Sequence, residues 1–349
     1  MLTKPIQTKH RSSGWSIVAL PAIVVLLIAG GWSIFWYSAS RRTSAAVQGW
    51  IAQEAKAGRN WSCENEKIRG YPFKIEISCT DLLFKGEIDG KPIAGTARGF
   101  QATSPLMRND NLLAKIEPPF TLTRGDGTPD VTLQWEAFYI ELEGPPRAYE
   151  RIAFMAKDLT VALESHTGDV MRGEFKEAIG SLSISPERHD HAYDFALTLN
   201  EGQVPALNGF LGTQKPIFAQ LDGTISQASL SGAQSLPDLL EMWRSADGKI
   251  DLRTARVTSG GVLVEARGRL DLDDSHHLNG KLDTAFAGFD SGFRQLNIDP
   301  AAIAAGRALS GLFGKSNQVP GRLSLPVVLS SGFVSIGPVR TAIQIPPLY

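Results

Sequence analysis

The stretch from Trp15 to Tyr37 restricts the possible folds more than any other part of the chain, because its 23 residues include no Asp, Glu, Lys, Arg or His. As an α-helix it would be about 34 Å long, and the hydrocarbon core of a bilayer is roughly 30 Å thick. Trp15 stands at one end, and Trp32, Phe35, Trp36 and Tyr37 cluster at the other, as is typical of the two membrane–water interfaces. We therefore expect a transmembrane helix over residues 15–37, after a short cytoplasmic tail of residues 1–14.

Two other interpretations of this stretch are a cleaved signal peptide and the core helix of a soluble protein. A basic leader and the small residues Ser38-Ala39-Ser40 fit a signal peptide, but an h-region normally has about 7–15 apolar residues and this one is longer. A core helix would carry a polar stripe, and none is visible. The sequence favours an uncleaved anchor.

The flanking charges do not decide the orientation, because Arg41 and Arg42 follow the apolar stretch almost as closely as the basic leader precedes it. The two cysteines, Cys63 and Cys79, are more informative. Cys79 shares the apolar face of an expected strand with Ile77, and Cys63 is its one available partner, which suggests a disulfide and an oxidising compartment. Two inert core cysteines or half of a zinc site are the alternatives. The disulfide would place the body outside the cytoplasm, so we expect a single-pass inner-membrane protein with a periplasmic body.

The rest of the chain has the composition of a folded, β-rich protein without an affinity for nucleic acid. Apolar residues make up 43 %, and 35 basic residues balance 36 acidic ones to a net charge of −1. Apolar and polar residues alternate in several segments, including 73–79, 193–199 and 262–272. Possible hairpin turns are Asp89-Gly90, Asp126-Gly127, Asp222-Gly223, Ser259-Gly260-Gly261 and Asn279-Gly280. We expect a mainly β fold, with large curved antiparallel sheets and a few short amphipathic helices.

The most regular strand is expected at 262–272. Its even-numbered residues form an apolar face that is a candidate groove for an apolar ligand, represented by Val262, Val264, Leu270 and Leu272. The odd-numbered face is largely charged. A strand with one face of each kind predicts a sheet that is covered on one side only.

Three helical segments are expected besides the anchor. Residues 38–60 should contain a separate juxtamembrane helix that Gly58 ends, and further helices are expected at Leu236–Trp243 and Ile303–Phe313. A weak similarity between Leu197–Leu211 and Leu282–Leu296 suggests that the β-rich body of residues 61–349 consists of two similar units, with a boundary near 200–235.

No pattern predicts an enzyme, a cofactor or a metal site. The histidine clusters His189-Asp190-His191 and His276-His277 lack the spacing and carboxylate partners of a zinc site. Asp271, Asp273 and Asp274 lack the glycine and terminal glutamate of a calcium loop. No nucleophile elbow or nucleotide-binding fingerprint is present.

Several segments resemble a known family. The anchor, Cys63, the run Gly70-Tyr71-Pro72-Phe73 and a strand that ends in Cys79 resemble the family of Gram-negative envelope proteins known as domain of unknown function 2125. The segments Gly248–Phe289 and Gly321–Tyr349 resemble it as well. Gly248–Phe289 is also similar to strand repeats of AsmA-like periplasmic proteins.

The resemblance implies a protein of the cell envelope with an elongated, curved sheet, and for some AsmA-like members it implies lipid carriage along a hydrophobic groove. We expect that the chain binds or passes a lipid or other apolar ligand on its sheet. The alternative is a non-catalytic scaffold that contacts other envelope proteins and fills its apolar face with its own helices.

Overall fold

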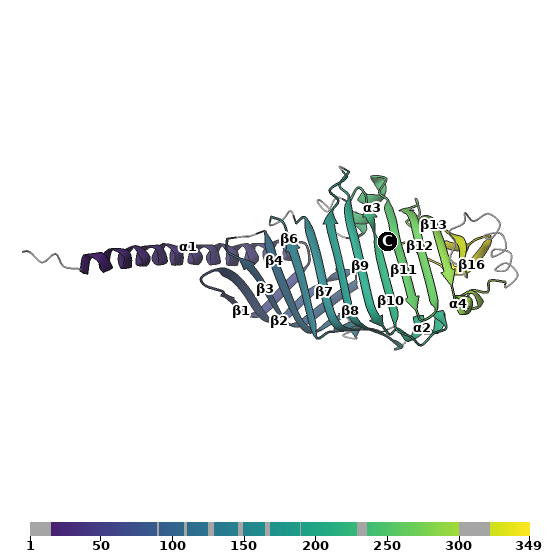
Figure 1. Cartoon of the computed structure of the whole chain (residues 1–349), viewed down its shortest axis with the longest axis horizontal. Coiled ribbons are helices and arrows are strands. Elements are labelled where there is room, and N and C mark those ends of the chain that lie inside the picture. The colour runs from purple at the N-terminus through teal and green to yellow at the C-terminus, as the bar shows by residue number, and fades with distance from the viewer. Residues whose placement is uncertain are drawn as a thin grey trace, which may run out of the picture.

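The computed structural model describes residues 15–88, 91–107, 110–124, 129–145, 149–164, 168–188, 190–228, 236–299 and 322–349. Four expected features lie wholly outside these ranges: the tail at 1–14, the helix at Ile303–Phe313 and the turns at Asp89-Gly90 and Asp126-Gly127. The described chain consists of one long helix followed by a large antiparallel sheet and three short helices (Figure 1).

Helix α1 (Trp15–Lys56) is continuous where the sequence suggested two helices. Nothing in residues 38–41 breaks it, because Ser and Ala are compatible with a helix and neither Gly nor Pro interrupts the run. Gly58, with a φ of 78°, follows the end of the helix as expected. The helix is long and apolar enough to cross a membrane. Its first part projects from the sheet, and its second part lies beside the first strands (Figure 1).

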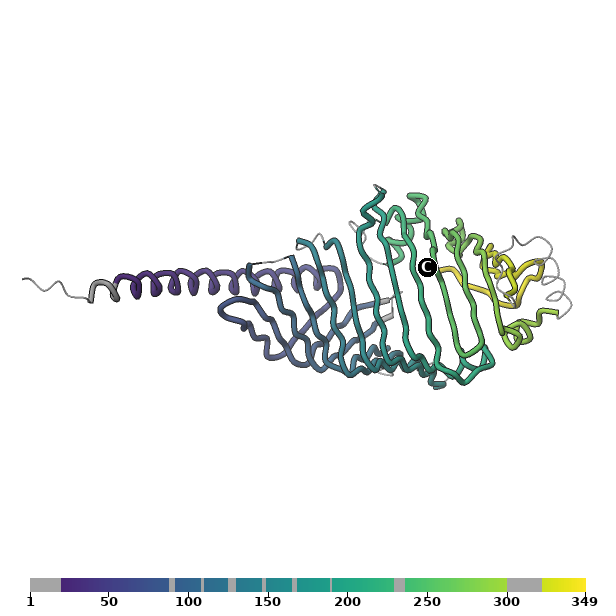
Figure 2. Tube along the Cα trace, viewed as in Figure 1, coloured from purple at the N-terminus to yellow at the C-terminus, as the bar shows by residue number. Residues whose placement is uncertain are grey.

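The sheet has 16 strands, and nearly all of them pair with their neighbours in the chain. Its first half contains β1 (Asn60–Arg69), β2 (Lys74–Ile88), β3 (Lys91–Pro105), β4 (Asn111–Arg124), β5 (Pro129–Gln134), β6 (Ala137–Glu143), β7 (Arg151–Glu164) and β8 (Val170–Ile184). Its second half contains β9 (Tyr193–Gly202), β10 (Ile217–Ile225), β11 (Ile250–Ser259), β12 (Val262–Leu272), β13 (Leu278–Ala287), β14 (Leu323–Ser330), β15 (Phe333–Ile336) and β16 (Val339–Gln344). The short strands β5 and β6 each pair with both β4 and β7, at different positions along them, and together they take the place of one strand. The chain therefore advances along the long axis of the molecule in sequence order (Figure 2).

The described strands on both sides of the boundary that the sequence suggested near 200–235 belong to one sheet. Strand β10 pairs with β9 on one side and β11 on the other. The weak internal similarity does correspond to two strand–helix segments, because α2 (Pro205–Leu211) follows β9 and α4 (Asp290–Gln295) follows β13. Both helices lie along one margin of the sheet, and α3 (Leu236–Ser245) lies along the other (Figure 1).

Two of the expected turns are parts of strands. Asp222-Gly223 lies within β10 and Asn279-Gly280 within β13, whereas Ser259-Gly260-Gly261 does connect β11 to β12. The glycines in β10 and β13 have another role, which is to make room for a side chain of the adjacent strand.

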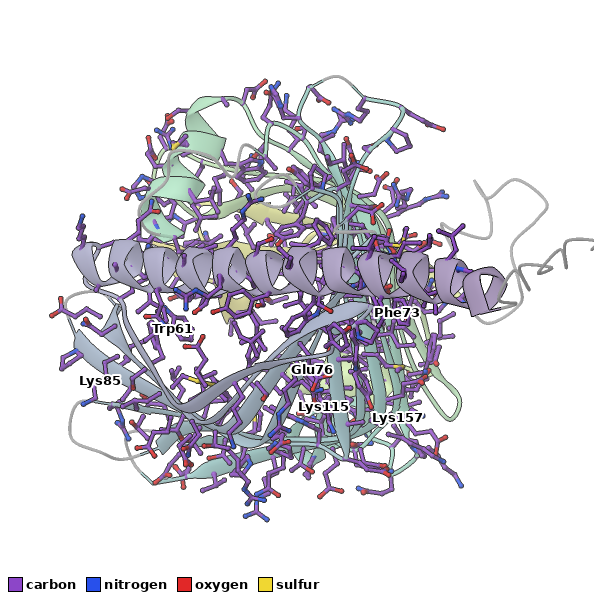
Figure 3. The ribbon with its side chains drawn as sticks, turned by 90° about the vertical axis from the view of Figure 1, so that its left-hand side faces the viewer. Trp61, Phe73, Glu76, Lys85, Lys115 and Lys157 are labelled. Carbon is purple, nitrogen blue, oxygen red and sulfur yellow. A yellow bond between two sulfur atoms is a disulfide. The ribbon has the colours of Figure 1, made fainter. Side chains whose placement is uncertain are left out.

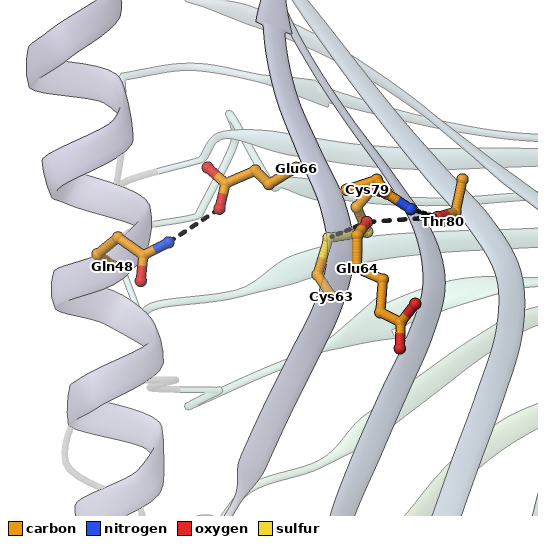
Figure 4. The surroundings of a disulfide bond; sticks show 7 residues. Gln48, Cys63, Glu64, Glu66, Cys79 and Thr80 are labelled. Atoms are coloured by element: carbon orange, nitrogen blue, oxygen red, sulfur yellow. Dashed lines mark hydrogen bonds between the residues drawn. A yellow bond between two sulfur atoms is a disulfide. The ribbon is translucent and has the colours of Figure 1, made fainter.

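The last turns of helix α1 pack against side chains of β1, the strand at one edge of the sheet. The indole of Trp50 packs on that of Trp61, which packs on Phe84, with ring centroids 5.6 and 4.6 Å apart. The amide of Gln48 donates to Glu66 over 2.9 Å (Figure 4). Side-chain contacts of this kind beside an edge strand hinder its pairing with another chain.

Cys63 of β1 and Cys79 of β2 form a disulfide, as the sequence suggested, with their Cα atoms 5.7 Å apart (Figure 4). The bond excludes the alternative of half a zinc site. It ties the first strand, and through it α1, to the rest of the sheet.

We expect either Cys63→Ala or Cys79→Ala to lower the free energy of unfolding by about 3 kcal/mol, because the bond closes a loop with a sequence separation of 16. The double variant should be about as unstable as either single variant. Denaturant unfolding of the full chain in detergent measures the change, with the reduced native chain as the control. Two titratable thiols in the unfolded, unreduced protein would contradict the bond.

Candidate functional site

One face of the sheet carries apolar side chains in continuous rows that run across the strands. Directly paired residues of antiparallel strands point to the same face, so the register defines each row. The central row consists of Ile77, Ala102, Ala114, Ile140, Phe154, Gly180, Leu197, Leu221, Ala255, Ala266, Thr284 and Leu325. Its one polar member, Thr284, donates its hydroxyl to the carbonyl of Leu325. The row reaches from β2 to β14 without a charged residue.

A further apolar row lies on each side of the central one. The first consists of Leu112, Leu142, Ile152, Leu182, Phe195, Gly223, Leu252, Gly268, Leu282, Val327 and Ile336. The second consists of Phe138, Ala156, Ala178, Leu199, Ala219, Val257, Val264, Phe286 and Leu323. We call these three rows the apolar trough. The opposite face carries ion pairs such as Arg253–Asp194 and Arg269–Asp251, at 3.2 and 2.6 Å.

Glycines on the trough face make room for large side chains of adjacent strands. The ring of Phe154 lies over its cross-strand partner Gly180, where a Cβ atom would overlap it, and Phe195 lies over Gly223 in the same way. Leu282 and Leu270 lean over Gly268 and Gly280, whose φ values of 152° and 142° also favour glycine. Large side chains therefore lie along the sheet instead of standing upright in the trough.

At one end of the trough, α1 covers a cavity of about 420 Å³. Phe35, Ala39, Arg42 and Thr43 form the side on α1. The sheet side includes Ile75, Ile77, Ala102, Ser104, Leu106 and Leu112. Seen from the end from which α1 projects, the sheet curves beneath the helix, and Trp61 and Phe73 lie next to it (Figure 3). The cavity is mainly apolar, and the guanidinium group of Arg42 gives it one cationic wall.

At the other end, α2 and α4 close the margin of the trough over a packed core. Leu211, Phe289 and Phe293 pack there with Val262, Phe286, Leu323 and Ile336 of the strands. Phe293 is 1 % exposed. The sequence indicated four residues as a groove face. Val262 belongs to this core, and Val264 packs against it. Leu272 is buried and Leu270 is half-buried. The first two therefore lie in a closed core, and contact of any of the four with a ligand stays a prediction.

Helix α3 lies at a margin of the sheet. Trp243 is buried against Gly248 and donates to the carbonyl of Ser226 over 2.7 Å. The C-terminal residue Tyr349 stacks on His276 and donates its hydroxyl to Glu241 over 2.7 Å. Hydrogen bonds from Arg244 and then Tyr349 hold the pKa of Glu241 well below its usual range.

The part of the chain that the structure describes contains no group of three or more His, Cys, Asp or Glu residues that could hold a metal ion. His189 lies outside it. His277 and Asp273 belong to the turn between β12 and β13, where the Asp273 carboxylate accepts hydrogen bonds from the backbone N–H groups of Ser275 and His277. Asp274 pairs with Arg244 at 3.0 Å. These residues therefore have structural partners.

Comparison with known protein families gave one match. A model of the family of uncharacterised proteins conserved in bacteria matches residues 36–344, which is most of the chain. The chain belongs to the DUF2125 family. A search of curated proteins found no match. The more distant likeness to AsmA-like proteins stays a prediction.

Sequence patterns alone did not reveal the cavity under α1 of this DUF2125 member. The cavity exists because the chain reverses direction after α1 and places β2–β4 beneath the second part of that helix, and a linear pattern does not indicate this reversal. The Gly70-Tyr71-Pro72-Phe73 motif was a usable signal, since it connects β1 to β2 and contacts α1.

We expect Gly180→Ala to lower the free energy of unfolding by about 1–3 kcal/mol, because the new methyl group would displace the ring of Phe154. The matched control is Gly209→Ala in α2, where a Cβ atom meets nothing within 4 Å and removal of a helical glycine should stabilise by about 0.5–1 kcal/mol. Denaturant unfolding measures both. Equal effects of the two substitutions would contradict the packing of Phe154 over Gly180.

Proposed function

We propose that this protein binds lipids or similar apolar molecules and passes them along the apolar trough, as a non-catalytic component of the bacterial cell envelope. The observation that carries the proposal is the absence of any charged residue from the three rows, over strands that extend from α1 to the distal core. A face of this kind is costly to expose, because each square ångström of apolar surface in water costs about 25 cal/mol. An apolar ligand would remove that cost.

The dimensions suit acyl chains. Twelve strands at a spacing of about 4.8 Å make the central row about 50 Å long along its curve, and the outer rows lie about 14 Å apart. One leaflet of a bilayer hydrocarbon core is about 15 Å thick. The trough therefore has room for more than one acyl chain in succession, and Arg42 is placed to contact an anionic headgroup at the α1 end.

Charge supports binding over catalysis. The polar groups that line the trough and the cavity under α1 are few, and they do not form the pairs of acid, base and nucleophile that enzymes use. The net charge of −1 and the ion-paired outer face give no footprint for nucleic acid.

A scaffolding role is the second candidate, and the distal core favours it. There α2 and α4 fill the margin of the trough with Leu211, Phe289 and Phe293, as a protein that binds no ligand would fill its own apolar face. In the middle of the sheet, however, Leu197 and Leu221 of the central row are only half-buried. The lipid-binding role and the scaffolding role therefore predict different contacts most clearly at β9 and β10.

Photo-crosslinking at β9 tests the proposal. With p-benzoylphenylalanine in place of Leu197, illumination of membranes that contain the full chain should attach lipid to the protein, and mass spectrometry should detect the adduct. The same amino acid in place of Thr198, on the opposite face, is the matched control and should give several-fold less adduct. Equal yields at both positions, or none at Leu197, would refute lipid binding in the trough.

We also propose that α1 is an uncleaved anchor in the inner membrane and that the sheet lies in the periplasm, which agrees with the Cys63–Cys79 disulfide. Alkaline phosphatase joined after Tyr349 through a flexible linker should be active, and deletion of residues 15–37 should abolish that activity. An active fusion placed before residue 14 would reverse the orientation.

A further inference from the structure

The margin of the sheet next to α1 exposes three large apolar side chains on two neighbouring turns. Tyr71 and Phe73, between β1 and β2, are 54 % and 70 % exposed, and Met107, between β3 and β4, is 80 % exposed. The two turns are joined, because the backbone N–H of Leu106 donates to the carbonyl of Phe73 over 2.9 Å. A protein surface in contact with water rarely exposes several large apolar side chains close together.

Two indoles of α1 hold the first turn in place. Trp32 Nε1 donates to the carbonyl of Pro72 over 2.8 Å, and Trp36 Nε1 donates to the carbonyl of Lys74 over 2.9 Å. The hydroxyl groups of Ser33 and Tyr71 are 2.9 Å apart, and the rings of Trp36 and Tyr71 meet edge to face at 5.7 Å. The turn is therefore fixed to one level of the helix.

The two indoles that hold the first turn belong to the uncharged segment of α1. Trp32 and Trp36 precede Tyr37, the last residue of that segment, by five residues or fewer, which corresponds to about 8 Å or less along the helix axis. A helix that crosses a bilayer with residues 15–37 places these indoles at the membrane–water interface, where Trp and Tyr are enriched. Whatever is attached to them must lie at the same depth.

We infer that the turns at Tyr71–Phe73 and Leu106–Met107 form a second membrane contact, which dips into the bilayer surface beside α1. The partner is the lipid of the membrane that α1 itself crosses. Exposed cations lie near the contact in the chain, because Arg69 comes just before the first turn and Arg41 and Arg42 follow the uncharged segment of α1, and anionic lipid attracts cations at such positions.

The contact determines where the cavity under α1 opens. Pro105 and Leu106, which lead into the second turn, line that cavity together with Phe35. Insertion of the two turns would therefore hold the cavity against the bilayer instead of the aqueous compartment. This inference rests on α1 as an anchor and does not depend on whether the trough carries a ligand.

Spin labels on the full chain test the contact. The variants Phe73→Cys and Met107→Cys report the two turns, and the two native cysteines are paired in a disulfide and do not react. Val25→Cys, within the apolar segment, shows that α1 is inserted, and Met171→Cys is an aqueous control, because Met171 is apolar and 53 % exposed on β8. The labelled proteins are reconstituted into vesicles of phosphatidylethanolamine and phosphatidylglycerol, and collision rates with oxygen and with a water-soluble nickel complex are measured.

We expect the labels at Phe73 and Met107 to collide several-fold more with oxygen, and several-fold less with nickel, than the label at Met171. Their depth should be less than that of the label at Val25. Nickel accessibility equal to that of Met171, with Val25 still deep, would overturn the membrane contact and leave the anchor intact. Protection from both oxygen and nickel would also overturn it, because it would indicate that a protein covers the turns.

Discussion

The register of the antiparallel strands is the constraint on which this structure depends. Side chains alternate between the two faces of a strand, so a slip of one residue between two neighbours would move an apolar set to the polar face. Here the pairing keeps Ile140, Phe154, Leu197 and Leu221 in one line across the successive strands β6 to β10. At β11 an irregularity between Leu252 and Ala255 inserts one extra residue and keeps both on the same face.

A sheet that is a single layer needs something to cover its apolar face, and the described helices do this at its two ends only. Helix α1 lies over β2–β4 and leaves a cavity between its own side chains and the sheet. Helices α2 and α4 pack so closely on β12–β15 that Phe293 is almost fully buried. The two ends of the trough therefore differ: one is a cavity beside α1, and the other is an ordinary protein core.

The class of the fold could be predicted from the sequence because alternation with a period of two is a local property. The strand Val262–Leu272 has the bounds that its pattern indicates. Gly223 and Gly280 were expected in turns because an Asp-Gly or Asn-Gly pair looks the same in a turn and beneath a cross-strand side chain. The disulfide partner was predictable because only one pairing of two cysteines exists.

The site was less predictable than the fold. Its rows depend on which residues face each other across strands, and Val264 shows the difficulty: its apolar face was identified, but the core that covers it comes from α2 and α4, whose residues are distant in sequence. The length of α1 was also missed, since an amphipathic segment and an apolar one were read as two helices. The contact between Trp32 and Pro72 is a tertiary interaction that no local pattern contains.

The order of the strands has a consequence for biosynthesis. Because each strand pairs almost entirely with the strands made just before and just after it, loop closure is short and the sheet can grow hairpin by hairpin as the polypeptide is synthesised. The disulfide between β1 and β2 can form early, because only 16 positions separate its two cysteines. The core under α2 and α4 is different, because it joins Leu211 to Ile336 and must wait until the polypeptide is nearly complete. A ribosome that stalled in the last third would therefore leave a nascent chain whose beginning is folded and cross-linked, and whose growing end still presents an open edge to its neighbours.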